Sequence, residues 1–153
     1  MIVVSDTSPI TALLTVGQIE LLHRLYGDVK IPPAVNDELR AYHIELPDFI
    51  QTVPVECDLL LDQLQVTLDR GEAEAIVLAK ALKADLLLMD EAMGRQAARL
   101  EHMPVIGLMG VLLIAKKKGL LTSVRDLVER LEAEAGFYLS RAVKAQVLAA
   151  AGE

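Results

Sequence analysis

Acidic residues stand where the apolar runs of this sequence end or where helical patterns begin. Asp6 follows the apolar run "IVVS", and Asp90 follows "ADLLLM". Glu38 lies in the helical pattern after "VKIPP", while Glu72 and Glu74 open the pattern "GEAEAIVLAKAL". Carboxylates that converge repel one another unless a cation compensates their charge. Because such ligands are all oxygen atoms, their convergence would predict a site for a hard cation, Mg²⁺ or Mn²⁺.

A carboxylate site of this kind suits phosphodiester hydrolysis. Metal ions held there activate a water molecule and stabilise charge on the attacked phosphodiester and on the leaving oxygen. Histidine and cysteine offer no competing site, because the three histidines lack metal-ligand spacing and the chain has a single cysteine, Cys57. The residue types therefore favour a hard-cation site over a zinc site.

Asp6 and Asp90 each have an ordinary structural interpretation as well. Asp6 could be a turn aspartate that bonds its own backbone. Ser8 followed by Pro9 is a good helix start, so we expect Ser8, and not Asp6, to cap the first helix. Asp90 precedes "EAMGRQAARL" and could be the N-cap of that helix. Both aspartates directly follow an apolar strand-like run, and this position favours the functional interpretation of each.

Helical geometry separates some of the remaining acids. At about 100° per residue, Glu38 falls on the flank of the apolar face of its helix, and Asp37 points away into solvent. Glu72 and Glu74 flank the apolar stripe of their own helix on opposite sides by similar angles. The helix dipole favours both of them in a first turn. Periodicity therefore cannot choose between Glu72 and Glu74.

The elements that must position these acids alternate along the chain. Strand-like runs at residues 2–6, 28–32, 49–55, 84–90 and 104–107 are separated by helical patterns, and two further helices are expected over roughly 122–135 and from about Ser140. This alternation predicts an α/β fold, a three-layer sandwich with a mostly parallel sheet of about five strands. Ligands bind outside the carboxyl ends of such strands, so we expect the acids to meet there.

Composition limits the class of protein. The 153 residues are the length of one domain, with no linker or repeat, so we expect a single domain over 1–153. No apolar run reaches the ~18 residues of a membrane span, and the N-terminus lacks signal-peptide features, so we expect a cytoplasmic protein. The net charge of −7 argues against a surface that binds nucleic acid throughout, but it leaves room for a local site.

Four stretches together resemble a PIN domain, the nuclease fold of many bacterial and archaeal toxins of the VapC kind. They are "VVSDTSPI", "IPPAVNDEL", "LDRGEAEAIVLAKALKADLLLMDE" and "PVIGLMGVLLIAKKKGLL", and they cover nearly the whole chain. The combination of DTSP, GEAEA and the closing GxxGVLLxAKxxGL looks like a branch of PIN-like proteins distinct from the best-studied toxins.

The resemblance implies that Asp6, Glu38, Glu74 and Asp90 form an acidic quartet that binds one or two Mg²⁺ or Mn²⁺ ions. Glu74 enters this set because the family's "DAxxxA" helix start aligns with "EAIVLA". Many PIN nucleases have aspartate where Glu74 stands. The extra methylene moves the carboxylate by about 1.5 Å, enough to alter ligation of an ion that demands near-octahedral geometry.

The resemblance also implies an activity and partners. It implies a metal-dependent endoribonuclease, a toxin of a toxin–antitoxin-like pair, with RNA as substrate, a small antitoxin protein as partner and a homodimer as assembly. Thr7 and Ser8 match family hydroxyls that help hold a ligand water, and Glu72 or Glu91 could serve as an auxiliary ligand. The rival interpretation is a PIN-like module that binds RNA or protein without cutting, in which the acids are only caps and surface charge.

Two other features receive structural interpretations. Arg95 and Arg99 share a helix face beyond Asp90 and could contact phosphates, but an ion pair with Glu91 or solvation is the expected role. The segment "GFYLSRAVKAQVL" carries two of the five aromatic residues, and core packing is its expected role, with self-association second.

Overall fold

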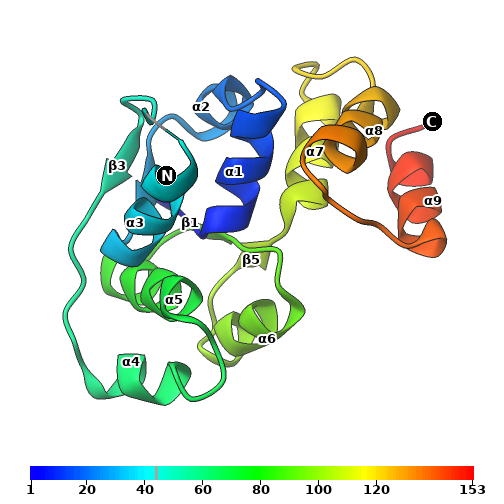
Figure 1. The fold of residues 1–153 in the computed structure, drawn as a ribbon. Helices are drawn as coiled ribbons and strands as arrows, with labels where there is room; N and C mark the ends of the chain where they lie inside the picture. Colours follow the sequence, from blue (N-terminus) through cyan, green and yellow to red (C-terminus); the bar gives the residue numbers. More distant parts are fainter. Residues whose placement is uncertain (44) are drawn as a thin grey trace.

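The computed structural model describes residues 1–43 and 45–153, and a parallel sheet lies at its centre between two layers of helices (Figure 1). The five strands are β1 (Val3–Ser5), β2 (Val29–Ile31), β3 (Ile50–Thr52), β4 (Leu86–Leu88) and β5 (Val105–Ile106). Every pair of neighbouring strands is parallel, and their order is β3-β2-β1-β4-β5. The predicted α/β sandwich is confirmed.

The helices divide between the two faces of the sheet. They are α1 (Thr7–Thr15), α2 (Glu20–Tyr26), α3 (Pro33–Tyr42), α4 (Leu59–Leu64), α5 (Arg70–Leu82), α6 (Ala92–Leu100), α7 (Leu108–Lys117), α8 (Val124–Glu134) and α9 (Arg141–Ala150). In Figure 1, α4, α5 and α6 lie below the sheet, α1, α2 and α7 lie above it, and α8 and α9 lie beyond α7. None of the described helices has the length and apolar character that crossing a bilayer requires.

The central strands are apolar because both of their faces are covered. Val3 of β1 and Leu88 of β4 pack into the core beneath α1, α7 and α8, whereas Val4 and Leu87 pack into the core beneath α5. All four side chains are fully buried. A strand buried on both faces has no polar alternation, which explains the continuous apolar runs in the sequence.

The strands are shorter than predicted because the chain turns into helices almost at once. β1 ends at Ser5 and α1 begins at Thr7, so Asp6 occupies the N-cap position. The prediction that Ser8 caps this helix was wrong, since Ser8 is already its second residue. Pro9 is tolerated in the first turn because the first four N–H groups of a helix have no partner within it.

The strand order reverses at the carboxyl ends of β1 and β4. The chain builds outward from β1 to β3 and then returns to the other side of β1 with β4. The N–H of Asp6 donates to the carbonyl of Leu88 over 2.9 Å, so these two strand ends are joined directly. In open α/β sheets, ligands bind at such a point of reversal.

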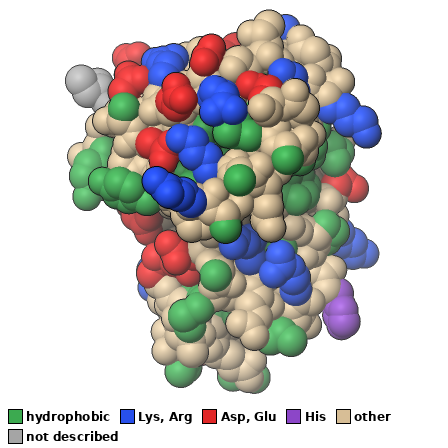
Figure 2. Space-filling model, turned by 90° about the vertical axis from the view of Figure 1, so that its right-hand side faces the viewer, with side chains coloured by type: hydrophobic (Ala, Val, Ile, Leu, Met, Phe, Trp, Pro, Cys, Tyr) green, Lys and Arg blue, Asp and Glu red, His purple; other side chains and the backbone are tan. Residues whose placement is uncertain are grey.

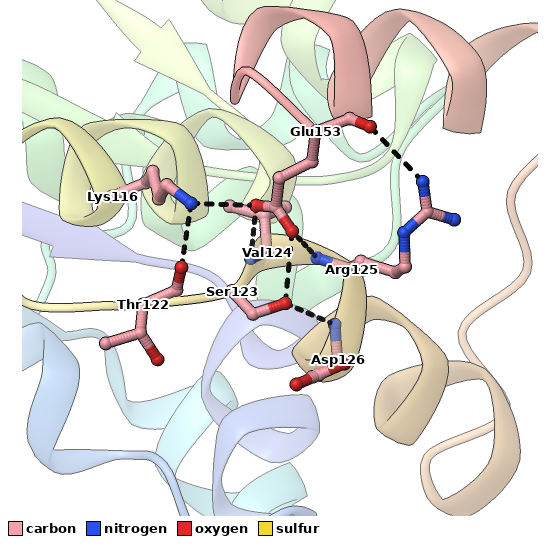
Figure 3. Close-up of polar contacts among 7 residues, drawn as sticks. All are labelled: Lys116, Thr122, Ser123, Val124, Arg125, Asp126 and Glu153. Atoms are coloured by element: carbon pink, nitrogen blue, oxygen red, sulfur yellow. Dashed lines mark hydrogen bonds and ion pairs between the residues drawn. The ribbon is translucent and has the colours of Figure 1, made fainter.

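The side chain of Glu153 fixes the C-terminal helices to one another (Figure 3). Its carboxylate accepts hydrogen bonds from the backbone N–H groups of Val124 (2.7 Å) and Arg125 (3.2 Å) at the start of α8. It also accepts from the Ser123 hydroxyl at 3.0 Å and pairs with Lys116 of α7 at 3.2 Å. These contacts, led by the Val124 N–H, lower the pKa of Glu153 to about 2.

Candidate metal centre

Asp6 lies at the carboxyl end of β1 and is only 5% exposed. It holds the N-cap position of α1, yet its side chain accepts no capping hydrogen bond. The pKa of Asp6 is raised to about 7, chiefly by burial; the nearby N–H of Thr7 lowers it in part, and the charges of Asp69, Glu38 and Asp90 contribute to the increase. Asp6 is therefore a buried acid that faces other carboxylates instead of capping its helix.

Glu38 reaches the same region from α3. Its Oε2 accepts a hydrogen bond of 2.6 Å from the Thr7 hydroxyl, which fixes the carboxylate beside the start of α1. Its Oε1 lies where Gly71 of α5 leaves room, because a Cβ on Gly71 would stand 2.6 Å from that oxygen. Asp37 is exposed, as the helical geometry predicts.

Asp90 follows β4 and is held by the start of α7. Its Oδ1 accepts the N–H of Leu108 at 2.7 Å, while its Oδ2 is buried and has no hydrogen-bond partner among the described residues. Burial raises the pKa of Asp90, and the Leu108 N–H and the charge of Arg95 lower it in part. The alternative that Asp90 caps its own helix was wrong, because Glu91 occupies the N-cap position of α6.

Arg95 of α6 supports the segment that carries Asp90. Its guanidinium donates to the backbone carbonyls of Asp90 and, at 3.5 Å, of Met89. Within the described part of the chain it forms no ion pair with Glu91, so that expectation was wrong. The arginine thus places a positive charge directly beside the acid site.

The first turn of α5 brings Glu72 toward these acids. Asp69 is the N-cap of α5, and its Oδ1 accepts the N–H of Glu72 at 2.8 Å. The pKa of Glu72 is raised to about 8, first by partial burial and then by the carboxyl groups of Asp69, Asp6 and Glu91. Sequence reasoning overlooked Asp69, although the spacing D-x-x-E in "DRGE" is that of a capping box.

Glu74 lies on α5 but has different partners. The start of α3 has no cap of its own, because the N-cap position is held by Pro32. Glu74 supplies the missing acceptor: one carboxylate oxygen accepts the N–H of Ala34 at 3.0 Å, and the other pairs with Arg70 at 2.6 Å. Only 3% of the Glu74 side chain is exposed. In this structure Glu74 joins α3 to α5.

Two further glycines lie against the carboxylates of this region. A Cβ on Gly94 of α6 would stand 3.3 Å from Glu72 Oε2, and a Cβ on Gly107 would stand 2.9 Å from Asp90 Oδ1. Contacts this close leave space for little more than a hydrogen atom. The backbone around the site is therefore shaped to let acidic side chains approach it closely.

The donor set fits a hydrated hard cation. Within residues 1–43 and 45–153, no three Asp, Glu, His or Cys side chains lie close enough to hold one ion directly. The acids are oxygen donors only, Asp90 Oδ2 is buried without a partner, and Asp6 is buried without a capping bond. Mg²⁺ usually keeps several waters and takes only one or two carboxylates, so widely spaced acids suit it better than a dry cage would.

Comparison with known proteins adds one match. A family model described as "DUF3368: PIN domain" matches residues 2–153. No curated protein matches the chain.

Proposed function

The chain belongs to the PIN-domain family, and on this basis we propose that it is a metal-dependent endoribonuclease. Proteins with this domain are generally nucleases and typically use divalent metals. The observation that carries the proposal is the buried, unpartnered Oδ2 of Asp90 at the end of β4, beside the buried Asp6 at the end of β1. An acid in that state favours a cation as its missing partner.

The acids proposed to hold the cation are Asp6, Asp90 and Glu38, with Glu72 as a fourth. Some of them act through the waters of the cation, because no three acids of the described residues lie close enough to bind one ion directly. A divalent cation supplies charge stabilisation at the phosphodiester and makes water a better nucleophile. The protein's own groups orient this site: the Leu108 N–H holds one oxygen of Asp90, and a threonine hydroxyl holds one oxygen of Glu38.

Glu74 stays a predicted ligand on the strength of the resemblance alone. Its hydrogen bonds to Ala34 and Arg70 support a structural role instead, because they occupy both carboxylate oxygens. The surroundings of Glu72, which include Asp6 and Asp69, support Glu72 as the acid that α5 contributes. Glutamine variants of the two glutamates distinguish these roles.

The test is cleavage of single-stranded RNA by purified protein in Mn²⁺, in Mg²⁺ and in chelator. We expect the natural protein to cleave only with a divalent cation, and Asp6→Asn and Asp90→Asn to lose most of this activity. Asp37→Asn is the matched control, because Asp37 is an exposed acid on α3 that points away from the site. It should cleave like the natural protein.

Cleavage that persists in chelator, or in both site variants, would contradict the proposal. If the natural protein does not cleave under any of these conditions, the alternative of a PIN-like module that binds without cutting is favoured. The roles of toxin, antitoxin partner and homodimer, and the cytoplasmic location, stay predictions that follow from the resemblance and the sequence. Sedimentation of the purified protein tests the dimer.

A further inference from the structure

A cavity of about 320 Å³ opens directly beside the acid site. Its lining includes Asp90, Arg95, Gly107, Phe137, Tyr138 and Val143. Its volume lies at the small end of the ~300–1,000 Å³ range of ligand pockets, which suits a single planar group. Because Asp90 belongs both to this cavity and to the acid site, any molecule bound here lies next to the proposed reaction centre.

The aromatic wall of the cavity comes from the segment between α8 and α9. Gly136 has φ +62°, a left-handed conformation that ends α8, and the N–H of Phe137 returns to the carbonyl of Leu131 at 3.1 Å. This turn directs the following residues toward α6 and α7. The Phe137 side chain is partly buried against the core, whereas Tyr138 is 87% exposed.

The segment "GFYLSRAVKAQVL" packs against the core as expected, through Phe137, Leu139, Val147 and Leu148, but its Tyr138 is exposed. An aromatic ring that is almost wholly exposed contributes little buried area to the core. Placed on the wall of a cavity, such a ring offers a face on which a nucleic-acid base can stack, and stacking of this kind tolerates every base.

The lining of the cavity also carries the charge that a phosphate needs. Arg95 lines the cavity and is anchored through the carbonyl of Asp90, so its charge is held at a fixed place. The first turn of α7 also borders the cavity at Gly107 and Met109, and the N–H groups of a helix start favour anions. An aromatic ring and a fixed positive charge in the lining of one cavity match the two parts of a nucleotide, its base and its phosphate.

The surrounding surface is compatible with a nucleic-acid strand despite the net negative charge. Figure 2 shows Lys and Arg side chains passing through the middle of the face built by the C-terminal helices, with most Asp and Glu side chains toward its left. Hydrophobic side chains are scattered among these cations. A single strand combines both requirements, since its backbone is anionic and its bases are apolar on their faces.

We propose that this cavity is a nucleotide subsite, in which the base of one residue of a single-stranded RNA stacks on Tyr138 and its phosphate lies against Arg95. The subsite rests on the proposed function, because it places a neighbouring nucleotide of the substrate beside the acid site. Tyr138 then contributes to the affinity for RNA and leaves the chemical step to the acids.

Two measurements test the subsite. Binding of a labelled single-stranded RNA of about ten nucleotides, within the ~4–16-nucleotide footprints of such sites, is followed by fluorescence anisotropy in chelator. Cleavage in Mn²⁺ is followed separately. We expect Tyr138→Ala to raise the Kd about 5- to 100-fold, the range for loss of one base–aromatic stack. In cleavage, the KM should rise by a similar factor with kcat unchanged.

Two control variants separate stacking from general damage. Tyr138→Phe keeps the ring and should bind RNA like the natural protein. Tyr42→Ala removes a different exposed tyrosine, 83% exposed at the end of α3, and should also have no effect. Arg95→Gln should reduce the salt dependence of binding, lowering the slope of log Kd against log salt by about 0.7, as for one phosphate contact on a single strand.

An RNA series with one abasic position at a time supplies the substrate side of the test. At one position, loss of the base should weaken binding to the natural protein and have no further effect on Tyr138→Ala. If Tyr138→Ala binds every RNA like the natural protein, the subsite is wrong even where cleavage is intact, and a protein segment becomes the better occupant of the cavity.

The subsite and the proposed function fail in different ways. Binding that depends on Tyr138, with no cleavage in any divalent cation, would overturn the nuclease while supporting the nucleotide subsite. Metal-dependent cleavage whose KM is unchanged in Tyr138→Ala would overturn the subsite and leave the nuclease standing. Failure of the natural protein to bind RNA in chelator and in Mn²⁺ would overturn the subsite as well.

Discussion

Glu72 and Glu74 stand two residues apart on α5, but their surroundings assign them different tasks. Partial burial and, after it, the neighbouring acids raise the pKa of Glu72 to about 8, and a bound cation would relieve the repulsion from those acids. Glu74 accepts hydrogen bonds from a helix N-terminus and from an arginine, and both of these stabilise a carboxylate without any cation. At the scale of single residues, the hydrogen bonds that each glutamate makes decide which of the two is available to bind a cation, although they are close in sequence.

Paired glutamine variants test this assignment. We expect Glu72→Gln to lose most of the metal-dependent cleavage and to melt at or above the temperature of the natural protein, because one repelling charge is gone. Glu74→Gln keeps an acceptor for the Ala34 N–H and should retain cleavage, with a loss of about 1 kcal/mol in the free energy of unfolding from the broken pair with Arg70.

Cleavage assays and urea unfolding of the same preparations give both readouts. The opposite pattern, in which Glu74→Gln abolishes cleavage without changing stability and Glu72→Gln cleaves normally, would restore Glu74 as the ligand that the resemblance implies.

The sequence identified Asp6 and Asp90 from their positions after apolar strands, because strand ends are visible in a pattern of residue types. The hydrogen-bond partners of the acids could not be predicted from such a pattern. The bond from Leu108 to Asp90 joins residues 18 apart in the chain, and the bond from Ala34 to Glu74 joins residues 40 apart. Periodicity describes which face of one helix a side chain occupies, so it cannot rank two glutamates whose difference lies in another helix.

At the scale of elements, the side chain of Glu153 joins three helices through one carboxylate. It stands at the N-terminus of α8, where backbone N–H groups and the helix dipole favour an anion, and Lys116 of α7 adds a positive charge. This junction fixes α9 relative to α8, and the segment that carries Tyr138 connects those two helices.

Glu153→Gln should loosen this junction. The folded pKa of about 2 is below the ordinary value of 4.5, so the carboxylate stabilises the fold above pH 4.5 and this stabilisation is lost as the pH falls toward 2. We expect the variant to melt below the natural protein at pH 6, with the difference disappearing near pH 2. Circular dichroism at the two pH values measures this.

Glu134→Gln is the control for that comparison. Glu134 pairs with Arg130 on the surface, with 46% of each side chain exposed, and such pairs contribute ~0–1 kcal/mol at most. If both variants melt alike at pH 6, the Glu153 junction does not stabilise the C-terminal helices.

All five predicted strands are present, because each strand of a parallel sheet covered on both faces needs a run of apolar residues. The exact ends of the helices and strands were harder to predict from the sequence. Ser8 was predicted as a cap because Pro9 follows it, yet the first helix begins at Thr7, two residues earlier than that cap implies. Local signals therefore located the elements, and tertiary packing set their boundaries.

At the scale of the whole molecule, acids gathered at one sheet edge make stability depend on pH and on cations. Asp6 and Glu72 have folded pKa values of about 7 and about 8, against ordinary values of 3.8 and 4.5. At pH values between the ordinary and the folded pKa of these acids, the folded chain binds more protons than the unfolded chain. The free energy of unfolding therefore falls as the pH rises from about 4 to about 8.

We therefore expect the melting temperature in chelator to fall between pH 5 and pH 8, and Mg²⁺ to restore it at pH 8. A cation present at 100 times its Kd stabilises the fold by ~2.7 kcal/mol. Asp6→Asn should flatten the pH dependence and reduce the response to Mg²⁺. A melting temperature that does not change with pH over this window, or with Mg²⁺, would contradict the charge repulsion inferred for the site.

The hydrogen bond from Leu108 to Asp90 also determines at what point during synthesis of the chain the acid site can form. Asp6 is synthesised before α7, but one oxygen of Asp90 has its hydrogen-bond donor in α7, and the Tyr138 segment follows α7 in the chain. A nascent chain to which Leu108 has not yet been added therefore lacks part of the acid site. The site of the proposed ribonuclease is therefore complete only after the start of α7 has been synthesised.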